Sequence, residues 1–293
     1  MKYRGSYCAL VTPFKNDEID TESFKKIINR HIESGTRGII PCGTTGESPT
    51  LSHDEHKYLI DQAVRFADGK IQVIAGTGSN STKEAISLTK YAKGAGADSS
   101  LIVVPYYNKP NQIGLRDHFL KIANEVDFPL FIYNIPGRSV VDMNNDTVIE
   151  LANHENIIGI KDASNDLSRP AIIKKFIRHK HFYQLSGEDG TQLGFLAQGG
   201  DGVISVTANL APSLLAKLQD SWHKNDFETA ILVDRKLTML NKLLFVESNP
   251  CPVKFGCYYL GLCNYEIRLP LTKISKTNEI KLIKEMEELK LSK

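Results

Sequence analysis

Two hydrophobic patterns alternate along most of the chain. Short apolar runs are each followed by a polar turn and then by a stretch whose apolar residues recur every three or four positions. The first pattern is typical of buried strands and the second of amphipathic helices, so the alternation predicts β/α units around a parallel sheet. Eight apolar runs occur, and they begin at Cys8, Gly38, Gln72, Ser100, Leu130, Ile157, Phe182 and Gly202.

The number of strands favours one architecture. Eight β/α units close more naturally into a (β/α)8 barrel than they spread into an open sheet, although the same periodicity is also typical of the doubly wound fold. From about Ala211 onward only helical patterns remain, over residues 214–227, 229–247, 251–262 and 278–290. We therefore predict an α/β protein with a TIM barrel over residues 1–225 and a helical C-terminal extension over residues 226–293.

Local residue types predict where several helices begin and end. Side chains that can accept a hydrogen bond from the first helical N–H groups predict N-caps at Thr21, Ser81 and Asn144. Glycine readily adopts the left-handed backbone that follows a helix, which predicts helix ends at Gly35, Gly69 and Gly94.

Charge and hydropathy argue against two classes of partner. The 36 Lys+Arg residues against 34 Asp+Glu leave a net charge of +2, far from the strongly basic balance of proteins that bind nucleic acid. No apolar run approaches the roughly 20 residues needed to cross a bilayer, and the N-terminal segment lacks the apolar core of a signal peptide. We therefore expect a cytoplasmic protein that binds neither nucleic acid nor membrane.

The sequence gives little support for a metal or nucleotide cofactor. The five cysteines form no C-x-x-C pair, and His53 and His56 have no evident third metal ligand. Buried thiols and an exposed polar helix face are the simpler interpretations. Gly76 and Gly78 lack the third glycine of a dinucleotide-binding loop. We expect no metal and no organic cofactor.

In a barrel of this kind the functional residues lie where strands end, because loops there vary while the barrel stays rigid. Lys161 closes the apolar run that begins at Ile157, which would carry an ammonium group toward a low-dielectric barrel mouth. Burial disfavours the charged form and yields the neutral amine that attacks a carbonyl carbon. The alternative is a strand-end lysine that reaches solvent or pairs with Asp162.

Other strand ends carry groups suited to proton transfer and carboxylate binding. Tyr133 offers a phenol that could pass protons, or it is an aromatic core residue. Thr44 and Thr45 lie between glycines, so a tight loop could present N–H groups and hydroxyls to a carboxylate, or it is only a turn. Arg138 follows Pro136 and Gly137 and suits bidentate carboxylate binding, or it is a solvated surface arginine.

Four motifs occur in one order along the chain: GTTGES at 43–48, PYYNKP at 105–110, YNIPGRS at 133–139 and GIKDAS at 159–164. Together they resemble the 4-hydroxy-tetrahydrodipicolinate synthase family, within the pyruvate-dependent class I aldolases that include N-acetylneuraminate lyase. The resemblance spans essentially the whole chain. It implies that Lys161 forms a Schiff base with pyruvate and that the derived enamine attacks L-aspartate 4-semialdehyde. The product would be 4-hydroxy-tetrahydrodipicolinate, in the diaminopimelate and L-lysine biosynthesis pathway.

The resemblance also implies the roles of the other site residues. Tyr133 and Thr45 would form a proton relay that Tyr107 completes from a neighbouring subunit, which implies a homo-oligomer, commonly a dimer of dimers. Arg138 resembles the residue that binds the semialdehyde carboxylate, and sialic acid lyases lack it. The pyruvate pocket is implied to include Thr44, Thr45, Gly187 and Ile204.

A regulatory site is implied by the same resemblance. Positions that match the L-lysine-binding set of feedback-inhibited members are Ser48, His53, His56, Asn80, Glu84 and Tyr106. We therefore expect inhibition by L-lysine. Pro49 departs from the alanine that family members often carry after the serine, and Val104 departs from a frequent threonine.

Two other functions stay open on the sequence. The chain could be a lyase of sialic acid or of a keto-deoxy sugar acid, which would cleave the sugar acid and ignore aspartate semialdehyde. It could also be a catalytically idle barrel that binds a small carboxylate, since a fold does not guarantee activity. The presence of Lys161, Tyr133 and Thr45 together argues against an idle barrel.

Overall fold

The structure is a computed structural model that describes residues 2–291. Its eight main strands form a closed parallel barrel whose neighbours follow the order β1-β10-β9-β8-β7-β6-β5-β4. The predicted TIM barrel is therefore confirmed, and the doubly wound open sheet is ruled out. The strands are β1 Gly5–Ala9, β4 Gly38–Ile40, β5 Gln72–Gly76, β6 Ser99–Val103, β7 Leu130–Asn134, β8 Ile157–Asp162, β9 Tyr183–Ser186 and β10 Gly202–Ser205.

All eight strand predictions are confirmed, because each barrel strand overlaps one of the eight apolar runs. The strand residues are almost all buried, which is why the runs are continuously apolar and do not alternate with polar residues. Two short strands, β2 Phe14–Lys15 and β3 Glu18–Ile19, pair antiparallel as a separate sheet that the sequence pattern did not predict.

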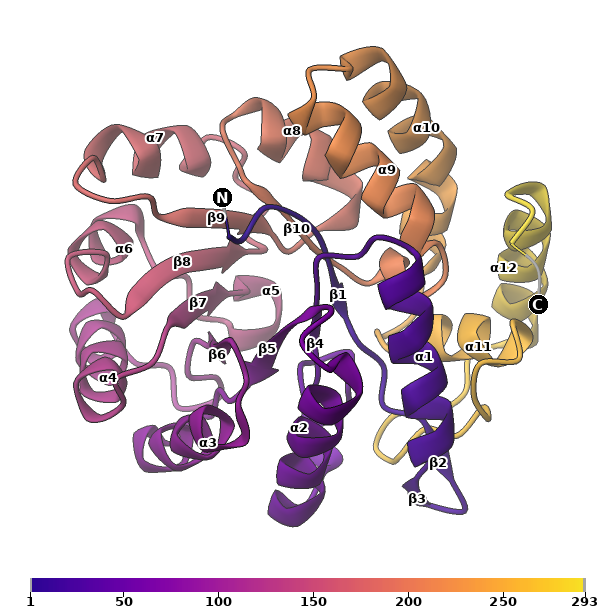
Figure 1. The fold of residues 1–293 in the computed structure, drawn as a ribbon, viewed down its shortest axis with the longest axis horizontal. Helices are drawn as coiled ribbons and strands as arrows, with labels where there is room; N and C mark the ends of the chain where they lie inside the picture. The colour runs from indigo at the N-terminus through magenta and orange to yellow at the C-terminus, as the bar shows by residue number, and fades with distance from the viewer. Residues whose placement is uncertain (1, 292–293) are drawn as a thin grey trace. The chain divides into compact units, whose positions relative to one another are not determined.

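The chain divides into two compact units. The first comprises Ile74–Ile204 with the N-terminal residues up to Arg4. Helices α3, α4, α6 and α7 lie along the outside of the strands (Figure 1), where α3 packs on α4, α4 on α6 and α6 on α7. Their bounds are α3 Thr82–Ala95, α4 Gln112–Glu125, α5 Pro136–Ser139, α6 Asn145–Leu151, α7 Arg169–Phe176, η2 Asp189–Thr191 and α8 Gln192–Ala197.

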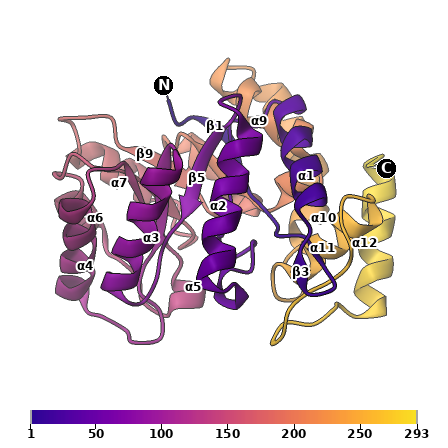
Figure 2. The same cartoon turned by 60° about the horizontal axis from the view of Figure 1, so that its bottom comes forward.

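The second unit comprises Gly5–Val73 with the chain from Ser205 onward. Here α1 packs on α2 and α9 packs on α10, and α12 contacts both α10 and α11 (Figures 1 and 2). The helices are α1 Thr21–Glu33, η1 Ser48–Thr50, α2 His53–Ala67, η3 Thr207–Asn209, α9 Pro212–His223, α10 Phe227–Leu243, α11 Cys251–Tyr259 and α12 Lys276–Glu288.

The helix starts agree with two of the three predicted N-caps. The side chains of Ser81 and Asn144 accept hydrogen bonds at the starts of α3 and α6, as predicted. Thr21 was wrong by one residue, because the carboxylate of Asp20 accepts from the backbone N–H of Ser23 and Thr21 is the first helical residue. An aspartate carboxylate also stabilises the positive end of the helix dipole.

The helix ends correct one predicted stop. Gly35 and Gly69 follow α1 and α2 with φ of +79° and +67°, as expected of glycine after a helix. Gly94 instead lies inside α3, and Gly96 ends that helix with φ of +91°. Because both glycines lie in one short segment, the composition could not decide between them.

The predicted boundary near residue 226 coincides with a helix start. Asp226 caps α10, and from Phe227 onward the described chain is helical apart from its connections. Whether residues 226–293 form a separate domain stays a prediction. Within the described part of the chain, no helix combines the length and apolar character needed to span a membrane.

Candidate active site

Two neighbouring strands bring an amine and a phenol into contact. In the parallel pairing of β7 and β8, Tyr133 is the register partner of Lys161. The two residues are each 6% exposed, and the Nζ atom of Lys161 lies 4.0 Å from the centre of the Tyr133 ring. The alternative of a lysine that reaches solvent is therefore wrong. A buried amine against an aromatic ring is shielded from water on that side, which suits a nucleophile.

Gly187, which directly follows β9, has no side chain to fill the space beside this amine. A Cβ atom added at Gly187 would lie 3.1 Å from Cε of Lys161 and 2.7 Å from Cβ of Ala163, too close for any larger residue without movement. The backbone N–H of Gly187 donates to the carbonyl oxygen of Asp162 at 2.7 Å. Gly187 therefore lies beside the lysine, and Ile204 is buried in β10, the strand that pairs with β9. That the two residues form part of a pyruvate pocket stays a prediction.

Glu188 shares the electrostatic environment of the amine. Burial raises the pKa of Glu188 and the neighbouring Asp189 raises it further, whereas the positive charges of Lys161 and Arg138 lower it. The backbone at Glu188 is fixed by Ser186, whose hydroxyl donates to the Glu188 carbonyl at 3.0 Å and accepts from its N–H at 3.1 Å. Sequence reasoning missed Glu188, although it directly follows Gly187.

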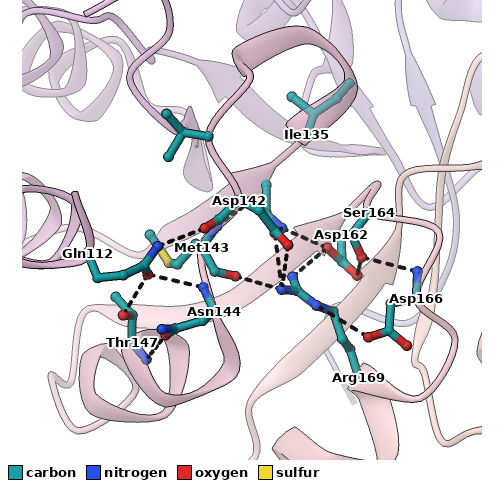
Figure 3. Close-up of polar contacts among 12 residues, drawn as sticks. Gln112, Ile135, Asp142, Met143, Asn144, Thr147, Asp162, Ser164, Asp166 and Arg169 are labelled. Carbon is teal, nitrogen blue, oxygen red and sulfur yellow. Dashed lines mark hydrogen bonds and ion pairs between the residues drawn. The ribbon is translucent and has the colours of Figure 1, made fainter. Parts of the chain in front are cut away.

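A polar network lies next to the catalytic candidates in the chain (Figure 3). Asn134 and Asp162 directly follow Tyr133 and Lys161 and are also register partners. Successive strand residues point to opposite faces, so this second pair faces away from the first. The amide of Asn134 donates to Asp142 at 2.8 Å and to Asp162 at 3.1 Å.

Arg169 joins the network from the first turn of α7. Its guanidinium lies 3.0 Å from Asp142 and 3.4 Å from Asp162, and it donates to the carbonyl oxygen of Met143 at 2.8 Å (Figure 3). The side chains of Arg169 and Asp162 are 7% and 4% exposed. Burial raises the pKa of Asp162, while Ser164, Arg169 and Asn134 lower it by stabilising the carboxylate. The network thus fixes the end of β8 to the segment that follows α5.

The helix that precedes this segment carries the predicted carboxylate-binding residue. Arg138 lies in the short helix α5 and is exposed. The helix is fixed at its end by Ser139, whose hydroxyl donates to the carbonyl oxygens of Ile135 and Val141 at 2.8 and 2.9 Å. A guanidinium suits bidentate binding of a carboxylate.

The second unit holds the GTTGE loop, which is a tight turn with one buried threonine. Backbone bonds run from the N–H of Gly46 to the Gly43 carbonyl at 3.0 Å and from the N–H of Glu47 to the Thr44 carbonyl at 3.1 Å. Thr44 is half-buried and Thr45 is buried. Glu47 has a left-handed backbone with φ of +56°, and its buried carboxylate accepts from Nζ of Lys254 at 2.5 Å.

The two tyrosines of the PYYNKP motif, Tyr106 and Tyr107, differ in their exposure to solvent. Tyr107 is 90% exposed and has a left-handed backbone with φ of +72°. Tyr106 is less exposed, at 38%, and desolvation together with the charge of Glu84 raises its pKa. The amide of Asn108 donates to the carbonyl oxygen of Asn80 at 2.9 Å.

The predicted lysine-binding residues are distributed over both units. Asn80, Glu84 and Tyr106 belong to the first unit, where Glu84 accepts from the hydroxyl of Ser79 and lies within electrostatic range of Tyr106. The other three belong to the second unit, with Ser48 at the start of η1, His53 as the first residue of α2, and His56 buried in that helix.

Comparison with known proteins places this chain among similar sequences and structures. Residues 2–289 match the model of the Dihydrodipicolinate synthetase family. A 4-hydroxy-tetrahydrodipicolinate synthase of Rhodospirillum centenum is 52% identical over 269 residues, which is 92% of each chain. The structure of the chloride-inhibited dihydrodipicolinate synthase of Acinetobacter baumannii in complex with pyruvate is 43% identical, with a TM-score of 0.95 over 98% of this chain and 99% of that one. A Cyanidioschyzon merolae structure with lysine bound is 38% identical, with a TM-score of 0.96 over 99% of both chains.

Replacing Arg169 by Gln should lower the free energy of unfolding by about 3 kcal/mol, because Asp162 stays buried without its positive partner. Without Arg169 the pKa of Asp162 rises further, so the deficit should shrink as the pH falls and Asp162 takes up a proton. Urea unfolding at several pH values measures both effects. Arg116→Gln is the matched control, because the ion pairs of Arg116 with Asp117 and Glu150 lie on the surface. Equal losses in the two variants would contradict this account of the network.

Proposed function

Because this chain belongs to the Dihydrodipicolinate synthetase family, whose matched relatives are lyases named 4-hydroxy-tetrahydrodipicolinate synthase, we propose that it condenses pyruvate with L-aspartate 4-semialdehyde. The product is 4-hydroxy-tetrahydrodipicolinate, in the diaminopimelate route to L-lysine. The observation that carries the proposal is the buried amine of Lys161 against the ring of Tyr133.

The reaction runs through covalent intermediates on Lys161. The neutral amine adds to the C2 carbonyl of pyruvate, and protonation of the resulting hydroxyl lets it leave as water to give the imine. Loss of a C3 proton gives the enamine, whose C3 bonds to the aldehyde carbon while the aldehyde oxygen takes up a proton. The amino group of the bound semialdehyde then displaces the lysine from C2, which closes the ring and frees Lys161.

The protons in these steps pass through hydroxyl groups. The phenol of Tyr133 is held beside Nζ of Lys161 by the β7–β8 register, and Thr45 and Tyr107 complete the relay. Tyr107 acts in the site of a neighbouring subunit, and its 90% exposure supports this role. The functional unit is therefore a homo-oligomer whose smallest form is a dimer.

Recognition of the second substrate depends on Arg138. Its exposed guanidinium binds the semialdehyde carboxylate, and Thr44, Thr45, Gly187 and Ile204 form the pyruvate pocket. The sugar acid lyase activity is not favoured, because the matched relatives carry the synthase name.

The main test of this proposal is an assay of the condensation, coupled to the reductase that consumes the product. Wild-type protein should turn over, and Lys161→Ala should lose activity by several orders of magnitude because no amine remains to form the imine. Borohydride added with pyruvate should attach a reduced pyruvyl group to wild type and not to the variant. Turnover by Lys161→Ala would refute the imine intermediate. If the wild-type protein does not catalyse the condensation but cleaves a sugar acid, the assigned substrate is wrong.

The shared relay can be tested by complementation. Tyr107→Phe and Lys161→Ala should each be nearly inactive alone, since each removes one part of every site. Refolding the two variants together should restore activity, because a mixed dimer contains one site with an intact lysine and a tyrosine from its partner. Wild type mixed with Lys161→Ala is the control for refolding yield. Mixtures that remain as inactive as the separate variants would contradict a tyrosine supplied by the neighbour.

In this proposal L-lysine also inhibits the enzyme, by binding to Ser48, His53, His56, Asn80, Glu84 and Tyr106. The support is the Cyanidioschyzon structure with lysine bound and the placement of Glu84 near Tyr106. Glu84→Gln should weaken inhibition at least tenfold, because an ammonium–carboxylate contact is lost. Glu150→Gln, a substitution on the exposed face of α6, is the control. If millimolar L-lysine does not change the activity of the wild-type enzyme, the proposed regulatory site is refuted.

A further inference from the structure

The short helix that carries Arg138 ends in a strained residue. Helix α5 is followed by Val140, whose backbone is left-handed with φ of +65° and whose N–H donates to the carbonyl oxygen of Pro136 at 2.9 Å. A β-branched residue adopts this conformation only where the surrounding structure fixes it, and such residues gather at functional sites. Val140 is 68% exposed, so hydrogen bonds and not the packing of its side chain hold this turn.

The two ends of the loop that contains α5 are joined by one side chain. Asn134, the last residue of β7, is fully buried. Its side-chain oxygen accepts from the backbone N–H of Met143 at 3.0 Å, and its amide nitrogen donates to the carboxylate of Asp142 at 2.8 Å. Residues 135–141 therefore form a loop that is closed at its base.

Asp142 attaches this base to the interior of the first unit. Its carboxylate lies 3.0 Å from the guanidinium of the buried Arg169, and its backbone carbonyl oxygen accepts from the amide of Gln112 at 2.8 Å (Figure 3). The side chain of Asp142 is itself 50% exposed. Asp142 thus joins an exposed loop to the buried side chains of Asn134 and Arg169, and its replacement leaves those two in place.

The loop lies in the same part of the first unit as the amine. The positive charges of Arg138 and Lys161 both act on the carboxyl group of Glu188. In the proposed reaction, one end of the second substrate reacts at the pyruvyl group on Lys161 while the other end binds Arg138. A small displacement of either group is costly when both must be met at once.

We propose that Asp142 is a positioning residue for the second substrate. By joining the loop to Asn134 and Arg169, it holds helix α5 in place. The guanidinium of Arg138 is thereby set at the position where the carboxylate of the aldehyde substrate binds. This inference rests on the proposed function, in which Arg138 binds that carboxylate. It assigns the polar network a role in substrate selection as well as in joining the strand ends.

Asp142→Ala tests the proposal by detaching the loop from its base. The KM for L-aspartate 4-semialdehyde should rise about tenfold or more, because the guanidinium is no longer held where the carboxylate binds. The KM for pyruvate should change by less than a factor of about two, because the amine of Lys161 is not altered. Borohydride should likewise trap pyruvate on the variant as it does on wild type.

Asp166→Ala is the matched control. The carboxylate of Asp166 also lies near Arg169, at 4.0 Å, and its side chain is 53% exposed, close to the value for Asp142. Asp166 precedes α7, however, and does not belong to the loop that carries Arg138. Only Asp142→Ala should raise the KM for the semialdehyde. Asp142→Asn should restore much of the affinity, because its side-chain oxygen can still accept from Asn134.

A double-mutant cycle separates positioning from general damage to the fold. Arg138→Gln alone should raise the KM for the semialdehyde, because the charged partner of the carboxylate is lost. Adding Asp142→Ala to Arg138→Gln should raise it little further, because no guanidinium remains to be positioned. A merely structural role of Asp142 would raise the KM by the same factor in both backgrounds.

Each outcome decides between these accounts. An unchanged KM for the semialdehyde in Asp142→Ala, an equal rise in Asp166→Ala, or equal factors in the double-mutant cycle would overturn the proposal. If Asp142→Ala does not fold, Asp142→Ser replaces it under the same criteria, because the shorter side chain cannot reach both partners. An unchanged KM in Arg138→Gln would instead refute the role of Arg138 in the proposed function, and absence of condensation in wild type would refute that function itself.

Discussion

The parallel register between β7 and β8 is the constraint on which the site depends. It pairs Tyr133 with Lys161 and Asn134 with Asp162, so one face of the two strands carries the amine and phenol and the other carries the polar network. A shift of one residue would exchange the two faces and turn the amine toward Asp142 and Arg169. The contact between the amine and the phenol ring and the network that joins the strand ends are therefore consequences of one pairing.

Buried charges in this protein are compensated by partners from other segments. Asp162 is stabilised by Arg169 from α7, and Glu47 by Lys254 from α11. In both cases the carboxylate lies within two residues of a functional candidate, Lys161 or Thr45. Well-formed buried pairs add little net stability, but breaking one is costly. Their value here is geometric, because a paired charge holds the backbone beside the candidate residue in one position.

The sequence allowed much of the fold and part of the site to be predicted. Every barrel strand was found because parallel strands are apolar on both faces, and Lys161 and Tyr133 were found because they end such runs. The ribbon of β2 and β3 was missed because two-residue strands have no readable period. Thr21 was displaced by Asp20, since both residue types cap helices and only the geometry decides between them.

What the sequence could not show are contacts between segments that are far apart in the chain. Nothing near Arg169 distinguishes it from surface polar residues, because its role comes from the atoms that it meets in the fold. Asn134 and Asp162 could have been predicted to lie near the site, since each directly follows a predicted site residue. Tyr107 was named from the motif alone, because the sequence does not show that its side chain is exposed in the fold.

The pairing of Glu47 in the GTTGE loop with Lys254 has a consequence for the order in which the protein matures. The last barrel strand ends at Ser205, so a ribosome has delivered every strand before Lys254 has been synthesised. During that interval Glu47 has no lysine beside it, and burying its carboxylate would be unfavourable. The nascent chain can therefore form its sheet early, but the threonine loop takes its final shape only when the C-terminal helices arrive. The GTTGE loop is therefore one of the last parts of this polypeptide to reach its final structure.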